Sequence, residues 1–161
     1  MKILRLLYFV LMVAVLHACS SPGSEEPTSF SSADTAKLAQ IIDIRTFKPT
    51  KVNFKYTYIA NTANSQRFGV PGPSYSRLEA VLDFDAATFE KIAEGYKSAA
   101  YISPNLDKKD FSFDWLDADV RNELDKIDST YKPAPDLLFG SDKNGGLWLL
   151  DKKILLIKFS N

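Results

Sequence analysis

The stretch Lys153-Ile154-Leu155-Leu156-Ile157-Lys158-Phe159-Ser160 decides the fold class, because its centre is continuously apolar. A strand that is apolar on both faces is typical of the middle of a sheet that is covered on both sides. The residues before it, 146–150, are also rich in apolar side chains, and Asp151 and Lys152 separate the two runs. We therefore predict a terminal hairpin in which residues 153–160 form a central strand.

In two further segments, residues of different character alternate at every second position. This period of two is typical of a strand with one buried face. In Arg77–Phe84, one face carries Leu78, Ala80, Leu82 and Phe84, and the other carries Glu79, Val81 and Asp83. In Asn53–Ala60, three aromatic residues share a face: Phe54, Tyr56 and Tyr58. Such an aromatic row forms a core face or stacks against a sugar or peptide ligand, and both interpretations stay open.

Three segments carry helix signals, namely apolar residues three and four positions apart behind a capping residue. They cover residues 34–44, capped by Ser32 or Asp34; residues 86–98, capped by Asp85; and a segment that ends near 128, capped by Asp114 or Asp117. A short strand is predicted at 137–139. Hairpins and tight turns beside helices indicate an α+β fold, with a mainly antiparallel sheet of about four strands and two or three helices packed on one face.

The polar segment 61–76 lies between the two alternating strands and is the best candidate for a ligand or partner contact. Its Pro71-Gly72 pair suits a type II turn, and at about 15 residues it is longer than an ordinary connection. Arg67, Tyr75 and Arg77 supply cationic and aromatic side chains that could contact an anion or a protein partner. The alternative is a long hairpin loop whose arginines are solvated.

The N-terminus has the three parts of a secretory signal. Residues 1–5 carry two positive charges, residues 6–16 form an unbroken apolar run, and the small residue Ala18 precedes Cys19. The 11 apolar residues are fewer than the roughly 20 that a membrane-spanning helix needs. We predict a signal peptide over residues 1–18; the alternative is an uncleaved anchor or a buried N-terminal helix.

Leu16, Ala18 and Cys19 resemble the lipobox of bacterial lipoproteins, in which Leu stands three positions before an obligatory Cys, whereas His17 departs from that pattern. The resemblance covers the first 19 residues only. It implies that Cys19 starts the mature protein, that its thiol is joined to diacylglycerol, and that its amine is often acylated. Two or three acyl chains, at roughly 0.8 kcal/mol per buried methylene, would anchor the protein stably. Ser20, rather than Asp, implies the outer membrane.

Composition predicts a tether and one domain behind this signal. Residues 19–32 are rich in Ser, Pro and Glu and are predicted to form a flexible tether, and residues 33–161 are the size of one α+β domain. Loss of Lys2 and Arg5 with the signal reduces the 20 basic side chains to 18, against 20 acidic ones, for a formal charge near −2. We therefore expect no nucleic-acid partner.

The predicted processing also restricts the chemistry, because His17 is the only histidine and Cys19 the only cysteine. A mature chain without His or a free thiol lacks a Ser-His-Asp triad, a Cys-His pair and a His-ligated zinc site. Two carboxylate pairs remain, Asp83 with Asp85 and Asp117 with Asp119. They could bind a cation or act in acid–base chemistry, but helix capping accounts for most of them. We predict no enzyme, no metal site and no cofactor.

These patterns predict a lipid-anchored protein of the bacterial cell envelope that acts as a non-catalytic interaction module, with an envelope protein as its partner. Such a module would carry an exposed apolar patch. The alternative is a small-ligand-binding domain that uses the 61–77 loop, with a pocket reached by Arg67, Arg77 and a Tyr. A carboxylate-based hydrolase is a further alternative, which would require two acidic side chains about 5–10 Å apart in a cleft.

Overall fold

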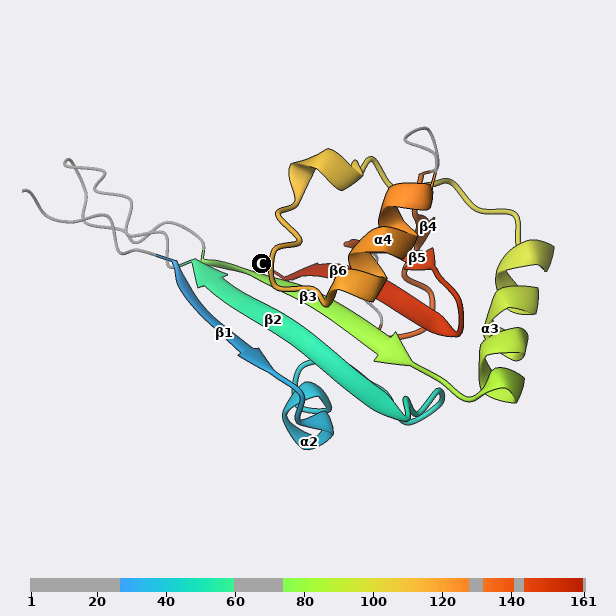
Figure 1. Ribbon diagram of the computed structural model, residues 1–161, viewed down its shortest axis with the longest axis horizontal. Coiled ribbons are helices and arrows are strands. Elements are labelled where there is room, and N and C mark those ends of the chain that lie inside the picture. The colour runs from blue at the N-terminus through green and yellow to red at the C-terminus, as the bar shows by residue number, and fades with distance from the viewer. Residues whose placement is uncertain (1–26, 60–73, 128–131, 141–143, 161) are drawn as a thin grey trace, which may run out of the picture.

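The fold is a six-stranded antiparallel sheet with helices on both faces, as the computed structural model shows (Figure 1). The structure describes residues 27–59, 74–127, 132–140 and 144–160. The strand order is β1-β2-β3-β6-β5-β4. The strands are β1 (Thr28–Ser32), β2 (Lys51–Ile59), β3 (Tyr75–Asp83), β4 (Ala134–Pro135), β5 (Gly145–Leu149) and β6 (Lys153–Ser160). The predicted α+β class is confirmed.

The terminal hairpin and its central strand are also confirmed. β5 pairs with β6, and β6 lies between β3 and β5 in the middle of the sheet. All four residues of the apolar run 154–157 are fully buried, two on each face of the sheet. A central strand buried on both faces explains why this run has no polar interruption.

Two separate apolar cores flank the sheet. One contains residues of α3 (Ala86–Ser98), of the short helix α2 (Thr35–Leu38) and of the segment after α2. The other contains Val120 and Leu124 of α4 (Ala118–Lys126), packed with Trp148 and Leu155. The prediction that all helices pack on one face was therefore wrong. On the second face, Val81 of β3 and Leu155 and Ile157 of β6 are buried apolar residues, and α4 keeps water from them.

The predicted helix over 86–98 is confirmed to the residue. Asp85 caps it: the Thr88 amide donates to Oδ1 at 2.9 Å, and the Thr88 hydroxyl donates to Oδ2 at 2.7 Å. These hydrogen bonds hold the pKa of Asp85 below its usual value. Asp117 precedes α4 but makes no capping hydrogen bond. Asp34 caps α2, which ends at Leu38, so the helix predicted over 34–44 is much shorter in the structure.

Two edge strands were missed, and they account for the larger sheet. β1 lies within the segment 19–32 that was predicted to be a flexible tether, and residues 28–32 are a strand instead. It pairs with β2 along its whole length, and the Phe30 ring packs against Phe54 and Tyr56 at centroid distances of 6.0 and 5.7 Å. The strand predicted at 137–139 does not form; the two-residue β4 precedes it instead.

A 3₁₀ turn, η1 (Lys108–Asp110), lies in the long connection between α3 and α4. In the part of the chain that the structure describes, no helix is both long and apolar enough to cross a membrane.

Candidate functional site

The predicted site residues fall in different places. Cys19 and Arg67 lie outside the described residues. Tyr75 is the first residue of β3 and is 43% exposed, and Arg77 follows on the same face of that strand. The Arg77 side chain is turned along its own strand, with Nε 2.8 Å from Oε1 of Glu79 and the guanidinium carbon 5.9 Å from the centre of the Phe111 ring. The Arg77 guanidinium therefore contacts Glu79 and Phe111 within the domain.

Glu79 is a fully buried carboxylate in the α4-side core. The indole Nε1 of Trp115 donates to its Oε2 at 2.7 Å. Its Oε1 faces Arg77, but the Arg77 N–H is not directed along the line between the two atoms, so the contact is an ion pair without a well-formed hydrogen bond. Sequence reasoning placed Glu79 on the open face of its strand and missed this contact. Its position beside Val81 on a strand next to the apolar run 154–157 was the available signal.

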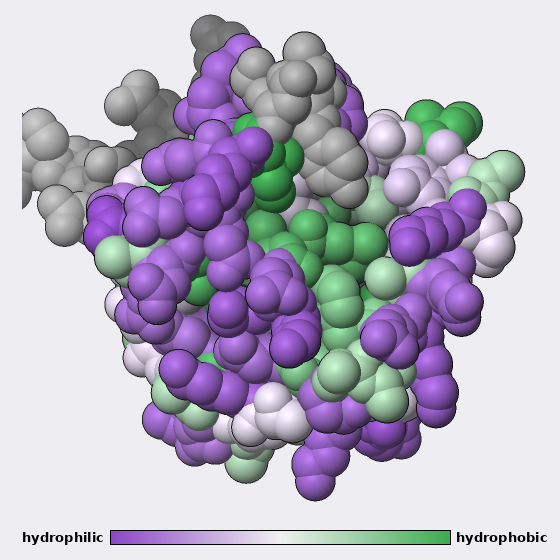
Figure 2. Space-filling model, turned by 45° about the vertical axis from the view of Figure 1, so that its right-hand side comes forward, coloured by the Kyte–Doolittle hydropathy of each residue, from purple (hydrophilic) through white to green (hydrophobic). Residues whose placement is uncertain are grey.

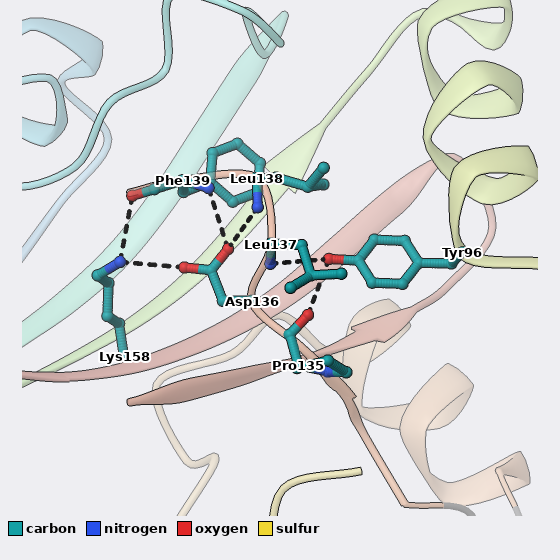
Figure 3. A network of polar contacts seen from close by, with 7 residues as sticks. All are labelled: Tyr96, Pro135, Asp136, Leu137, Leu138, Phe139 and Lys158. Atoms are coloured by element: carbon teal, nitrogen blue, oxygen red, sulfur yellow. Dashed lines mark hydrogen bonds and ion pairs between the residues drawn. The ribbon is translucent and has the colours of Figure 1, made fainter. Parts of the chain in front are cut away.

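A second buried ion pair joins Asp136 to Lys158 on the opposite face of the sheet (Figure 3). Lys158 Nζ lies 3.1 Å from Asp136 Oδ2 and donates to the Phe139 carbonyl at 3.2 Å. The amides of Leu138 and Phe139 both donate to Asp136 Oδ1 at 3.0 Å. These bonds occupy the backbone of 138–139 and explain why it does not form the predicted strand.

Tyr96 of α3 secures the same segment from the other side (Figure 3). Its hydroxyl donates to the Pro135 carbonyl at 2.9 Å and accepts from the Leu137 amide at 3.2 Å. Burial raises the pKa of Tyr96 to about 12. The segment 135–139 is thus held between α3 and β6 by hydrogen bonds at both ends.

Stability should depend on pH through Tyr96 at high pH. Its pKa is 10.0 without burial and about 12 in the fold, so the unfolded chain loses this proton first. The stabilisation is complete below pH 10 and is lost as pH rises through the folded pKa. We expect the free energy of unfolding of the wild type to fall more steeply between these values than that of Tyr96→Phe. Urea unfolding at a series of pH values measures this. If the free energy of unfolding fell equally steeply with pH in both proteins, the assignment to Tyr96 would be contradicted.

Lys158 also borders a cleft on the α2 side of the sheet, formed by two adjoining pockets. The larger pocket, of about 470 Å³, lies between residues 39–45 and the turn at Phe139–Gly140. The smaller, of about 230 Å³, reaches over the ends of β2, β3 and β6. Both are lined by Gln40, Ile41 and Lys158. We call this pair of pockets the Lys158 cleft.

The charges in the Lys158 cleft come in pairs. Lys158 is matched by Asp136, and Arg45 is matched by Asp43 at 2.6 Å, which lowers the pKa of Asp43 to about 2. The other polar groups are uncharged, and in the smaller pocket they are Gln40, Tyr56, Ser76 and Ser160. Ser76 and Ser160 are directly opposite each other on β3 and β6. The cleft therefore offers hydrogen-bonding groups and an aromatic side chain without a net charge.

Of the two predicted carboxylate pairs, Asp83 with Asp85 and Asp117 with Asp119, three members lie together in the structure. Asp83, Asp117 and Asp119 line a small pocket of about 100 Å³, together with Lys51 and Lys153. Charges of both signs thus share this pocket. Among the described residues, no group of three or more His, Cys, Asp or Glu side chains is placed to hold a metal ion.

No family model, curated protein or solved structure matches this chain. A functional assignment therefore has to come from the residues and their geometry.

Proposed function

We propose that this protein is a lipid-anchored component of the bacterial cell envelope, in the outer membrane, and that its domain acts by binding rather than by catalysis. The observation that carries the binding half is the Lys158 cleft, a concave surface whose charged groups are already paired. The anchoring half rests on the resemblance of residues 16–19 to a lipobox.

The lining of the cleft favours an uncharged ligand that is rich in hydroxyl or amide groups. An anionic ligand would have to compete with Asp136 for Lys158, and a cationic one would have to compete with Arg45 for Asp43. Gln40, Ser76 and Ser160 can each donate and accept hydrogen bonds, and Tyr56 adds an aromatic ring on the same side. This combination fits a neutral glycan segment, whose hydroxyls need donors and acceptors and whose ring faces pack on an aromatic side chain.

Titration with neutral oligomers of N-acetylglucosamine tests this assignment. We expect the full-length protein in detergent micelles to bind them, and Gln40→Ala to weaken binding by about three- to tenfold, because one hydrogen bond contributes roughly 0.5–1.5 kcal/mol. Asn122→Ala, an exposed amide on α4 away from the cleft, is the matched control and should bind like the wild type. Absence of binding, or an unaffected Gln40→Ala variant, would reject the cleft as a glycan site.

Cys19→Ala tests the anchor separately. We expect the wild type to incorporate labelled palmitate and to fractionate with membranes, and the variant to lose the label and to leave the membrane fraction. Acyl chains contribute roughly 0.8 kcal/mol per buried methylene, so removing two or three of them abolishes stable binding. A variant that stays equally membrane-bound would show that another part of the chain holds the protein there.

A protein partner is the second candidate function, and exposed apolar side chains favour it. Ile102 is 92% exposed, Leu137 53% and Tyr101 40%. Tyr101 packs edge-on against Tyr96, and the Leu137 amide donates to the Tyr96 hydroxyl. Tyr101 and Leu137 therefore both lie beside Tyr96. Figure 2 shows apolar surface gathered in a hollow that is bordered by polar side chains. An envelope protein could cover such a surface.

A further inference from the structure

Two exposed tyrosines mark one end of the sheet. Tyr58 is the next-to-last residue of β2 and is 45% exposed; Tyr75 is the first residue of β3 and is 43% exposed. Ser76, the neighbour of Tyr75, is paired with Tyr58 in the ladder, so the two tyrosines are adjacent along the sheet and point to opposite faces. The segment 60–73 connects the two strands at this end and lies outside the described residues.

Among the described residues, the strand ends on this side of the sheet are uncharged. β1 and β3 begin at this end and β2 and β6 finish here, and the two terminal residues of each are uncharged: Thr28 and Ser29, Tyr75 and Ser76, Tyr58 and Ile59, Phe159 and Ser160. At the opposite end, β2 begins with Lys51, β3 ends with Asp83 and β6 begins with Lys153. The two ends of the sheet therefore differ in polarity, and the uncharged end carries the exposed aromatic rings.

The chain that leads to the predicted lipid enters the domain at this uncharged end. Thr28, the first residue of β1, is paired with Tyr58, and Figure 1 shows β1 starting beside the end of β2 and the start of β3, with α3 at the far side. Cys19 and Thr28 are nine residues apart in the sequence. Nine residues reach at most about 30 Å and about 17 Å on average as a flexible coil. A lipid on Cys19 would keep this end of the sheet close to the bilayer.

We propose that Tyr58 and Tyr75 insert into the headgroup region of the membrane that holds Cys19, so that the sheet stands end-on against the bilayer. This inference rests on the proposed lipid anchor. Tyrosine favours the membrane–water interface, because its ring leaves water while its hydroxyl stays hydrated. The strand-end residues beside the two rings are uncharged, and Arg77, which follows Tyr75 on its face, is paired with the buried Glu79. This lowers the cost of bringing the strand ends to the hydrocarbon boundary. The short tether then makes docking nearly intramolecular.

Paramagnetic relaxation from the lipid side, read at the amides of ¹⁵N-labelled protein, tests the proposal without a spin label on the protein. The lipidated full-length chain is placed in nanodiscs of phosphatidylethanolamine and phosphatidylglycerol that contain a lipid with a nitroxide on its headgroup. We expect strong relaxation enhancement of the amides at 57–59 and 75–77. Little enhancement is expected at Lys97, in the last turn of α3, and at Tyr101, which follows α3. In Tyr58→Ser/Tyr75→Ser, the enhancement at the strand ends should fall several-fold.

Tyr101→Ser is the matched control, because Tyr101 has similar exposure (40%) but lies beyond α3; it should keep the wild-type pattern. Amide spectra that are unchanged away from the substitutions show that each variant is folded. Co-elution of the protein with nanodiscs reports the anchor independently. Loss of co-elution overturns the anchor and this proposal with it. Co-elution with no enhancement at the strand ends, or with enhancement that the double variant retains, overturns the end-on contact alone.

Discussion

The Asp136→Ala variant is expected to lose about 3–5 kcal/mol of its free energy of unfolding, because removing one partner of a buried ion pair leaves the other charge uncompensated. Lys158 would keep only the Phe139 carbonyl as a described partner. The amides of Leu138 and Phe139 would also lose the oxygen to which both donate. A loss of this size is a large part of the stability of an ordinary domain. Urea or guanidinium unfolding followed by circular dichroism measures it.

A second substitution separates the charge from the hydrogen bonds. Lys158→Met removes the ammonium, and we expect the double variant Asp136→Asn/Lys158→Met to be more stable than the two single changes would predict by addition, since it contains no unpaired buried ion. Asp125→Ala, an exposed carboxylate on α4, is the control and should change stability by no more than about 0.5 kcal/mol. Additive losses in the cycle would mean that Asp136 and Lys158 do not interact across the fold.

The strands and helices that were predicted correctly are those whose own residues carry the pattern. β6 is apolar at four successive positions, and α3 has a capping Asp85 followed by apolar residues at helical spacing. β1 has only Phe30 as an apolar residue, so its strand structure comes from pairing with β2, which no local pattern reveals. β4 is two residues long and includes Pro135, which weakens any strand signal.

The candidate site was less accessible to prediction, because it depends on contacts between distant residues. Lys158 lies between Ile157 and Phe159 on a central strand, which signals a buried charge. Its partner Asp136 lies 22 residues away, in a segment with no regular pattern of its own. Gln40 lines the cleft from the segment after α2, which ends at Leu38, whereas the sequence predicted it inside a helix over 34–44. Arg77, which was predicted as a contact residue of the 61–77 region, lies on the face of β3 opposite the Lys158 cleft.

The two buried carboxylates support the sheet from opposite faces. Asp136 holds a backbone segment against β6 on the α2 side, whereas Glu79 holds Trp115 at the start of the α4 region. In both cases the cation comes from a strand and the neutral donors come from an irregular segment. A carboxylate that accepts from several groups can fix a segment that lacks a ladder or helix of its own.

The Glu79→Ala variant is expected to lose about 2–4 kcal/mol, somewhat less than Asp136→Ala, because Arg77 is 31% exposed and can be hydrated without its anion. The substitution leaves the Trp115 N–H without its acceptor and Arg77 without its anion, and it opens space in the core beneath α4. Near-ultraviolet circular dichroism should change as well, because Trp115 loses the bond that orients its ring. Guanidinium unfolding gives the free energy, and Glu90→Ala on the exposed side of α3 is the control.

Glu79→Gln distinguishes the charge of Glu79 from its role as an acceptor. The amide oxygen can still accept from Trp115, and the Arg77 side chain is 31% exposed and can be hydrated when its anion is removed. The loss should therefore be smaller, about 1–3 kcal/mol, which is the range for an imperfectly satisfied buried polar group. Trp115→Phe in the Glu79→Gln background should then cost less than in the wild type, because the bond it removes is already weaker. If Glu79→Gln were as unstable as Glu79→Ala, the ion pair with Arg77 would be the dominant contact, and the hydrogen bond from Trp115 would contribute little.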